Sequence, residues 1–305
     1  MPPDPVWRSS VFRAQKNTRT PMVISIISNG MNIAGNAFLI WGLRLGVAGA
    51  ALATLGSRIF CAVVVLWYLR KTENMVCVRD YRRIRPDFPL IKRILAIGIP
   101  SGVENGMFQF GKLAIQSTVS TLGTAAIAAQ AMTNIMENVN GVGAVGVGIG
   151  LMTVVGQCIG AGRRDEARYY IKKLTIIAEV TIIISCLAVF LITRPVTILG
   201  GMEKESADLC MYMVMWITIV KPISWTLSFI PAYGMRAAGD VKFSMIVSCT
   251  TMWLCRVSLC VFLCRVMGFG PIAVWIGMFA DWTVRAVIFT ARFISGKWVE
   301  HRVIQ

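Results

Sequence analysis

Long apolar stretches constrain this chain of 305 residues more than any other feature of its sequence. A helix that crosses the hydrocarbon core of a bilayer needs roughly 20 mostly apolar residues. The composition agrees, since 56% of the residues are hydrophobic and only 15% are charged, whereas soluble domains average about 25% charged residues. We therefore predict an all-α polytopic membrane protein with eight transmembrane helices. Their expected ranges are 22–43, 46–69, 94–121, 124–159, 174–193, 206–234, 243–267 and 270–294.

The 31 Lys and Arg residues are unequally distributed over the loops between these stretches. With both termini in the cytoplasm, the cytoplasmic segments hold 22 of them and the opposite side holds 4. Such a bias is what the positive-inside rule predicts. The net charge of +16 therefore indicates topology, and nucleic acid is not an expected partner. We predict a multi-pass protein of the cell (cytoplasmic) membrane, with the lipid bilayer as its surroundings and both termini cytoplasmic.

Several classes of protein are disfavoured by what the chain contains. The single histidine is His301, near the C-terminus, and the nine cysteines never form a C-x-x-C pair. The chain therefore lacks the residues needed for a histidine-based triad or for a zinc ribbon. We expect no enzyme, no metal and no cofactor, apart from transported Na⁺ or H⁺. Residues 1–20 have no apolar core segment, so a cleavable signal peptide is not expected.

An internal repeat appears when the chain is shifted by 223 residues. Residues 12–22 then align with residues 235–245, and both segments precede a pair of apolar stretches. Duplicated lobes are common in membrane transporters. The repeat predicts that residues 94–295 form a complete six-helix lobe and that residues 1–69 are the last two helices of a second lobe. The whole protein would then have twelve helices, of which this chain lacks four. We expect a separate chain to supply these four helices, and the alternative is that the chain is an inactive fragment.

Two polar segments complete this organisation. Residues 70–93 contain eight cations and two prolines, and we predict a cytoplasmic linker between the lobes. Residues 296–305 form a short cytoplasmic tail.

Ionisable residues inside the predicted spans are the first candidates for a site. A charge in hydrocarbon costs several kcal/mol unless it faces a cavity or a partner. Nine such charges over eight spans predict an interior in contact with water, and we expect them to face a wet crevice between helical bundles. They are Glu104, Glu137, Glu179, Asp281, Arg58, Lys112, Lys221, Arg256 and Arg285.

A polar stripe marks the fourth span. Gln130, Asn134, Glu137 and Gly141 recur at helical spacing and so share one face, with Asn138 beside them. Such a stripe suits either a cavity wall or hydrogen bonds between helices. A carboxylate at Glu104 could bind a cationic compound or carry a coupling proton, and a structural ion pair is the alternative. The candidate substrate- or ion-binding residues are Glu104, Lys112, Asn134, Glu137, Asn138 and Lys221.

Other local patterns predict how the helices pack. The glycine-dense segment 141–150 favours close helix contact over a hinge. Pro222 and Pro231 are expected to interrupt the sixth span, as in helices that line a cavity. Asp281 and Arg285, four residues apart, are expected to pair along one helix face.

Three motifs resemble the multidrug and toxic-compound extrusion (MATE) family. They are Gly98-Ile-Pro-Ser-Gly-Val-Glu-Asn105, Gly156-Gln-Cys-Ile-Gly-Ala-Gly162 and Arg236-Ala-Ala-Gly-Asp240. From the residues alone, the second motif is a capped turn between two helices, and a gating role is the alternative. The family motif and gating residues are Gly156, Gln157, Gly160, Gly162, Arg236, Gly239 and Asp240.

The resemblance implies a secondary antiporter in which two lobes alternate access to a central cavity. It would export amphiphilic or cationic drugs in exchange for Na⁺ or H⁺. The chain departs from the family pattern because it lacks the first four helices, carries Lys16 where the family loop has glycine, and carries Lys221 where relatives have a carboxylate. Glu104 matches only the subgroup with G-x-P-x-x-x-E. A lipid-linked oligosaccharide flippase of the same superfamily, which needs a basic cavity for pyrophosphate, is the alternative function.

Overall fold

The computed structural model describes residues 19–69 and 87–299, and the chain divides into two units, Met1–Asp87 and Phe88–Gln305. The described residues form helices and turns and contain no strand, so the predicted all-α class is confirmed. Lys16, His301, most of the predicted linker and the end of the tail lie outside the described residues.

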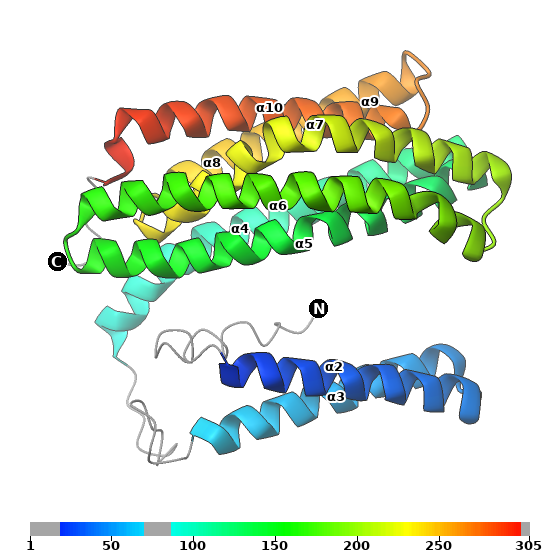
Figure 1. Ribbon diagram of the computed structural model, residues 1–305, viewed down its shortest axis with the longest axis horizontal. Helices are drawn as coiled ribbons and strands as arrows, with labels where there is room; N and C mark the ends of the chain where they lie inside the picture. The colour runs from blue at the N-terminus through cyan, green and yellow to red at the C-terminus, as the bar shows by residue number, and fades with distance from the viewer. Residues whose placement is uncertain (1–18, 70–86, 300–305) are drawn as a thin grey trace. The chain divides into compact units, whose positions relative to one another are not determined.

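The first unit is a helical hairpin. Helix α2 (Arg19–Ala37) continues into the π-helical turn η1 (Phe38–Gly42), and α3 (Gly46–Leu69) returns beside it (Figure 1). The turn between them is tight, because Arg44 and Gly46 both have positive φ, at 52° and 53°. Ser28 Oγ donates to the Ser57 carbonyl at 3.1 Å, which is one of the polar contacts that join the two helices.

The second unit contains six helical rods among its described residues, as expected for one lobe. Figure 1 shows them as long, roughly aligned ribbons. The elements are α4 (Phe88–Val119), η3 (Ser120–Leu122), α5 (Thr124–Gly160), α6 (Arg164–Leu199), α7 (Lys204–Ala237), α8 (Val241–Thr251), η4 (Met252–Val257), α9 (Ser258–Arg265), α10 (Ile272–Ser295) and η5 (Lys297–Val299). The third and fourth rods are α6 and α7. The fifth rod is one continuous helix, made of α8, η4 and α9, that changes from α to π and back to α.

Helix α4 begins earlier than predicted. It starts at Phe88, inside the stretch 70–93 that was expected to be linker, with Pro89 in its first turn. Proline is tolerated there because the first backbone N–H groups of a helix have no partner within the helix. The domain boundaries proposed from sequence otherwise stay a prediction.

Seven helical segments in the described part of the chain are long and apolar enough to cross a membrane, one fewer than the eight predicted. They are Arg19–Gly42, Gly46–Trp67, Thr124–Gly160, Arg164–Leu199, Lys204–Ala237, Val241–Arg265 and Ile272–Ser295. The eighth, α4, has 32 residues but carries several charges along its length, among them Lys92, Glu104 and Lys112. Large apolar side chains such as Ile184 and Leu191 are exposed on α6, as a lipid-facing helix requires.

The core of the second unit forms where α5 packs against α6 and α7, and α7 against α10. Its largest fully buried side chains include Trp275 and Phe289. Glycines let α5 approach its neighbours. A Cβ at Gly143 would lie 2.7 Å from Thr181 Cγ2, and one at Gly148 would lie 2.6 Å from the Tyr233 ring. The packing role predicted for segment 141–150 is confirmed at these two positions, and α5 is continuous through it.

The prediction that prolines interrupt the sixth span is wrong. Helix α7 continues from Lys204 to Ala237 with Pro222 and Pro231 inside it. Each proline removes one backbone donor, but the tight packing of α7 between α5, α6 and α10 keeps the remaining turns helical.

Candidate functional site

Two adjoining cavities lie within the second unit, with volumes of about 470 and 660 Å³. Both are lined by residues of α4, α5, η4 and α10, and α7 adds to the larger cavity. They share five lining residues, which are Lys112, Glu137, Asn138, Arg256 and Met278. Both volumes fall within the range of small-molecule sites, roughly 300–1,000 Å³.

The two cavities differ in chemistry. The larger one has an aromatic wall made by Phe108, Trp225, Phe229, Tyr233 and Trp282. Within this wall the rings of Trp225 and Phe229 are stacked, with centroids 4.9 Å apart. The smaller one is lined by the side-chain amides of Gln109, Gln116, Gln130, Asn134 and Asn138. Together they offer an apolar surface beside a polar one, which suits an amphiphilic molecule.

Glu137 and Lys221 form a buried ion pair at the edge of the cavities. Lys221 Nζ lies 2.7 Å from Glu137 Oε1 and also donates to the Glu137 carbonyl at 3.1 Å. The ammonium lies 5.3 Å from the centroid of the Trp225 ring. The Lys221 side chain is fully buried, whereas that of Glu137 is 19% exposed. Sequence analysis named both residues, and the structure brings them together across α5 and α7.

The polar stripe on α5 serves both of the roles considered for it. Gln130 is buried and accepts a hydrogen bond from Trp275 Nε1 at 3.0 Å, which joins α5 to α10. Asn134 and Asn138 are exposed and line the smaller cavity, and Asn138 Nδ2 donates to the Asn134 carbonyl at 2.7 Å. The stripe therefore lines the smaller cavity, and its buried member Gln130 also joins two helices.

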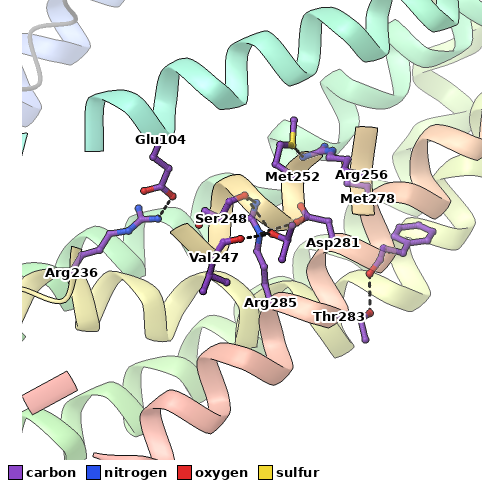
Figure 2. Close-up of polar contacts among 12 residues, drawn as sticks. Glu104, Arg236, Val247, Ser248, Met252, Arg256, Met278, Asp281, Thr283 and Arg285 are labelled. Atoms are coloured by element: carbon purple, nitrogen blue, oxygen red, sulfur yellow. Dashed lines mark hydrogen bonds and ion pairs between the residues drawn. The ribbon is translucent and has the colours of Figure 1, made fainter. Parts of the chain in front are cut away.

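Glu104 lies outside the residues that line either cavity. It is 5% exposed, and Arg236 Nη2 donates to its Oε1 at 2.5 Å (Figure 2). Asp240 lies four residues after Arg236 and accepts a hydrogen bond from Arg292 Nε at 2.9 Å. The first and third sequence motifs therefore meet at the Glu104–Arg236 pair, which joins α4 to α7. The Asp240–Arg292 pair joins the start of α8 to α10. The structure thus shows Glu104 in an ion pair, and a binding role for this residue stays a prediction.

Asp281 and Arg285 form the ion pair predicted from their spacing, and it is confirmed at 2.8 Å. Both side chains are sealed, at 0% and 1% exposure. Arg285 also donates to Thr251 Oγ1 at 2.9 Å. It donates in addition to the Ser248 carbonyl at 3.1 Å (Figure 2). The expectation that every buried charge faces a wet crevice is wrong for this pair, because both side chains are sealed and pair with each other, although Asp281 Oδ2 is buried without a hydrogen-bond partner among the described residues.

Lys112 and Arg256 are the cations that line both cavities. Lys112 is exposed on α4, and Arg256 belongs to the π-helical turn η4. Sequence analysis placed Lys112 in the site but gave Arg256 no role beyond its being an intramembrane charge. It also missed Trp225 and Phe229. Lys221, Trp225 and Phe229 follow one another at intervals of four residues, which places all three on one face of α7.

The glycine motif after α5 ends that helix. Gly162 has φ of +75°, Arg163 N donates to the Cys158 carbonyl at 2.9 Å, and Gly162 N donates to the Ile159 carbonyl at 3.0 Å. This is the hydrogen-bond pattern of a Schellman cap. Gly239 ends α7 in the same way, with Asp240 N donating to the Met235 carbonyl at 3.0 Å. A gating role for Gly156, Gln157, Gly160 and the other motif residues stays a prediction.

Comparison with known proteins gives sequence relatives along nearly the whole chain. The "Probable multidrug resistance protein NorM" of Thermotoga maritima is 26% identical over 306 residues, which cover 97% of this chain and 64% of the relative. The "Probable multidrug resistance protein YoeA" of Bacillus subtilis is 26% identical over 311 residues, covering 97% of this chain and 66% of the relative. The chain thus spans about 64% to 66% of the length of these relatives.

A solved structure shows the same fold. The "Outward-facing conformation of a multidrug resistance MATE family transporter of the MOP superfamily" matches with a TM-score of 0.84 and 18% identity, covering 95% of this chain and 66% of that one. Two family models also match. The model described as "Lipid II flippase MurJ" matches residues 8–85. The model described as MatE matches residues 100–262, which are more than half of the chain and include the cavity-lining residues of α4, α5, α7 and η4. The chain therefore belongs to the MatE family.

Proposed function

We propose that this chain is part of a secondary antiporter that exports amphiphilic or cationic small molecules in exchange for Na⁺ or H⁺. The observation that carries the proposal is the pair of adjoining cavities inside a six-helix unit, one aromatic and one lined by amides. Membership of the MatE family supports it, as do the names of relatives described as multidrug resistance proteins. We place the protein in the cell membrane with both termini cytoplasmic, and we propose transport rather than enzymatic chemistry.

In this proposal the second unit is one of two lobes that alternate access to the cavity. The apolar part of the substrate would pack against Trp225 and Phe229, where it loses contact with water. Its polar part would exchange hydrogen bonds with water for hydrogen bonds with Asn134 and Asn138. Few strong contacts and a large apolar wall favour broad selectivity, because apolar contact is not directional.

Efflux from proteoliposomes tests the proposal. The chain is reconstituted with ethidium inside the vesicles, and either a Na⁺ gradient or a pH gradient is imposed. We expect one of the two gradients to accelerate dye release, and Trp225→Ala and Asn138→Ala to slow it. Ile176→Ala, on the exposed face of α6 and outside both cavities, is the control and should leave release unchanged.

The alternatives give different outcomes in the same vesicles. Correctly inserted protein that releases no dye under either gradient contradicts antiport by this chain alone. Co-reconstitution with helices equivalent to the first four of the Thermotoga maritima relative is the next step. Dye release that occurs only in their presence would identify a partner chain. Movement of a fluorescent lipid-linked pyrophosphate between leaflets, without dye release, would favour the flippase.

A further inference from the structure

The two cavities are lined by two cations that form no ion pair with a described carboxylate. In residues 19–69 and 87–299 no carboxylate lies within ion-pair distance of Lys112 or Arg256, although both line each cavity. The other cations of the spans in this unit differ, since Lys221 pairs with Glu137 and Arg285 pairs with Asp281. The cavities therefore concentrate unbalanced positive charge.

The surroundings of Arg256 show that its donors are poorly satisfied. Its Nε is enclosed and has no hydrogen-bond partner. Its Nη1 lies 3.9 Å from the Met252 sulfur, and its Nη2 lies against the Met278 sulfur (Figure 2). A thioether is only a weak acceptor. A partly buried guanidinium with such neighbours gains most from an anion, because desolvation of an unpaired charge is costly.

The backbone holds Arg256 firmly in place. The residue lies in η4, a π-helical turn inside an otherwise α-helical rod, and such turns are rare and frequent at functional sites. Helix α10 packs so closely here that a Cβ at Gly277 would lie 2.7 Å from the Arg256 carbonyl oxygen. The backbone of Arg256 is thus fixed in the cavity wall, which reduces the conformational entropy that is lost when a ligand binds.

The acid in the lining does not offset these two cations. Glu137 faces the cavities, but Lys221 Nζ is 2.7 Å from its Oε1, and the pair is neutral as a whole. The face of Trp225, which could otherwise attract a cationic ligand, already has the Lys221 ammonium 5.3 Å from its centroid. Glu137 and the face of Trp225 are therefore already engaged by Lys221 within the protein.

We propose that these cavities bind amphiphiles that carry an anionic group, such as a carboxylate, sulfonate or phosphate. The anion contacts Lys112 and Arg256, the amides of Asn134 and Asn138 donate further hydrogen bonds, and the apolar body lies against Trp225 and Phe229. This inference rests on the proposed transport site and assigns to it amphiphiles of net negative charge in place of cationic ones. The anion can come from a soluble amphiphile or from a lipid headgroup, which have the same chemistry.

A pair of probes with the same ring and opposite charge tests the proposal. The full chain is placed in nanodiscs of neutral phosphatidylcholine and titrated calorimetrically with naphthalene-1-sulfonate and with naphthalen-1-ylmethyl-trimethylammonium. We expect the sulfonate to bind more tightly. Arg256→Gln and Lys112→Gln should each weaken sulfonate binding by about tenfold, the size expected for one charge-assisted hydrogen bond, whereas Arg256→Lys should retain most of it.

The control variant is Lys172→Gln, which removes an exposed cation on α6 outside both cavities and should leave binding unchanged. Lys112 is exposed, so the Lys112→Gln variant keeps the test valid if Arg256→Gln fails to fold. Repeating the titration in nanodiscs of phosphatidylglycerol separates the sources. Loss of sulfonate binding to the unchanged protein in phosphatidylglycerol, together with an equal loss in the Arg256→Gln and Lys112→Gln variants, supports anion recognition. It assigns the site to an anionic lipid headgroup.

Three results would overturn the inference. They are tighter binding of the ammonium probe, no binding of either probe, and a preference for sulfonate that neither cavity variant changes. Gradient-driven ethidium efflux together with any of these results would support the proposed transport function and refute only the anionic substrate class, so the two failures are distinguishable.

Discussion

At the scale of single residues, the Glu137–Lys221 pair has the most direct energetic consequence. The ammonium is fully buried, whereas the carboxylate reaches the cavity and is 19% exposed. Removal of either partner leaves an unpaired charge, but the two cases are not equivalent. A carboxylate at the cavity stays in contact with water, whereas a sealed ammonium that loses its partner gains no water in exchange.

We therefore predict an asymmetric effect on stability. Glu137→Gln should lower the free energy of unfolding by about 3 kcal/mol, since it strands a buried charge. Lys221→Met should cost clearly less, and the double variant should recover most of the loss. Unfolding in mixed detergent micelles measures all three. Glu166→Gln, which breaks an exposed pair with Arg163 at 3.4 Å, is the control and should cost less than about 1 kcal/mol. Equal losses in both single variants would contradict this account.

At the scale of helices, backbone contact between α10 and η4 fixes the cavity wall. A Cβ at Gly277 would lie 2.7 Å from the Arg256 oxygen and 3.4 Å from the Cys260 nitrogen. Both are backbone atoms, so neither can move aside as a flexible side chain would. The substitution must push the two helices apart.

Gly277→Ala should therefore destabilise the chain by about 1–3 kcal/mol, the usual cost of overpacking. Gly150→Ala is the matched control, because a Cβ there has no other atom within 4 Å. It should be neutral or slightly stabilising, since alanine favours a helix by up to about 1 kcal/mol over glycine. Both values come from the same unfolding experiment, and a Gly277→Ala variant as stable as the Gly150→Ala variant would refute the tight contact.

The elements also show what the sequence can and cannot predict. The long apolar runs and basic loops predicted the helical rods, because length and hydropathy suffice for that. The Asp281–Arg285 pair was predictable since both residues lie on one helix. The contact between Glu104 and Arg236 was not, because 132 positions separate them and only the packing of α4 against its neighbours brings them together. The interruption predicted at Pro222 failed for a similar reason, because tertiary packing keeps α7 helical through this residue.

At the scale of the whole chain, alternating loop charge predicts orientation in the membrane. Before and within the first turns of α6 lie Arg163, Arg164, Arg168, Lys172 and Lys173, whereas its last turns and the start of α7 carry only the cations Arg194 and Lys204. We predict that Arg164→Cys faces the cytoplasm and Glu203→Cys faces outward. In right-side-out vesicles of a variant whose natural cysteines are replaced by alanine, an impermeant maleimide should label only Glu203→Cys. Labelling of Arg164→Cys instead would invert the topology.

The central claim is that the polar face of α5 meets water inside the membrane. Asn138 and Val139 are neighbours and both are exposed in the second unit, but only Asn138 lines a cavity. In the same cysteine-free background, a water-soluble methanethiosulfonate added to both sides should modify Asn138→Cys rapidly, because only a hydrated thiol ionises, and should leave Val139→Cys in the lipid unmodified. Equal rates at the two positions, or no reaction at Asn138→Cys, would contradict the claim.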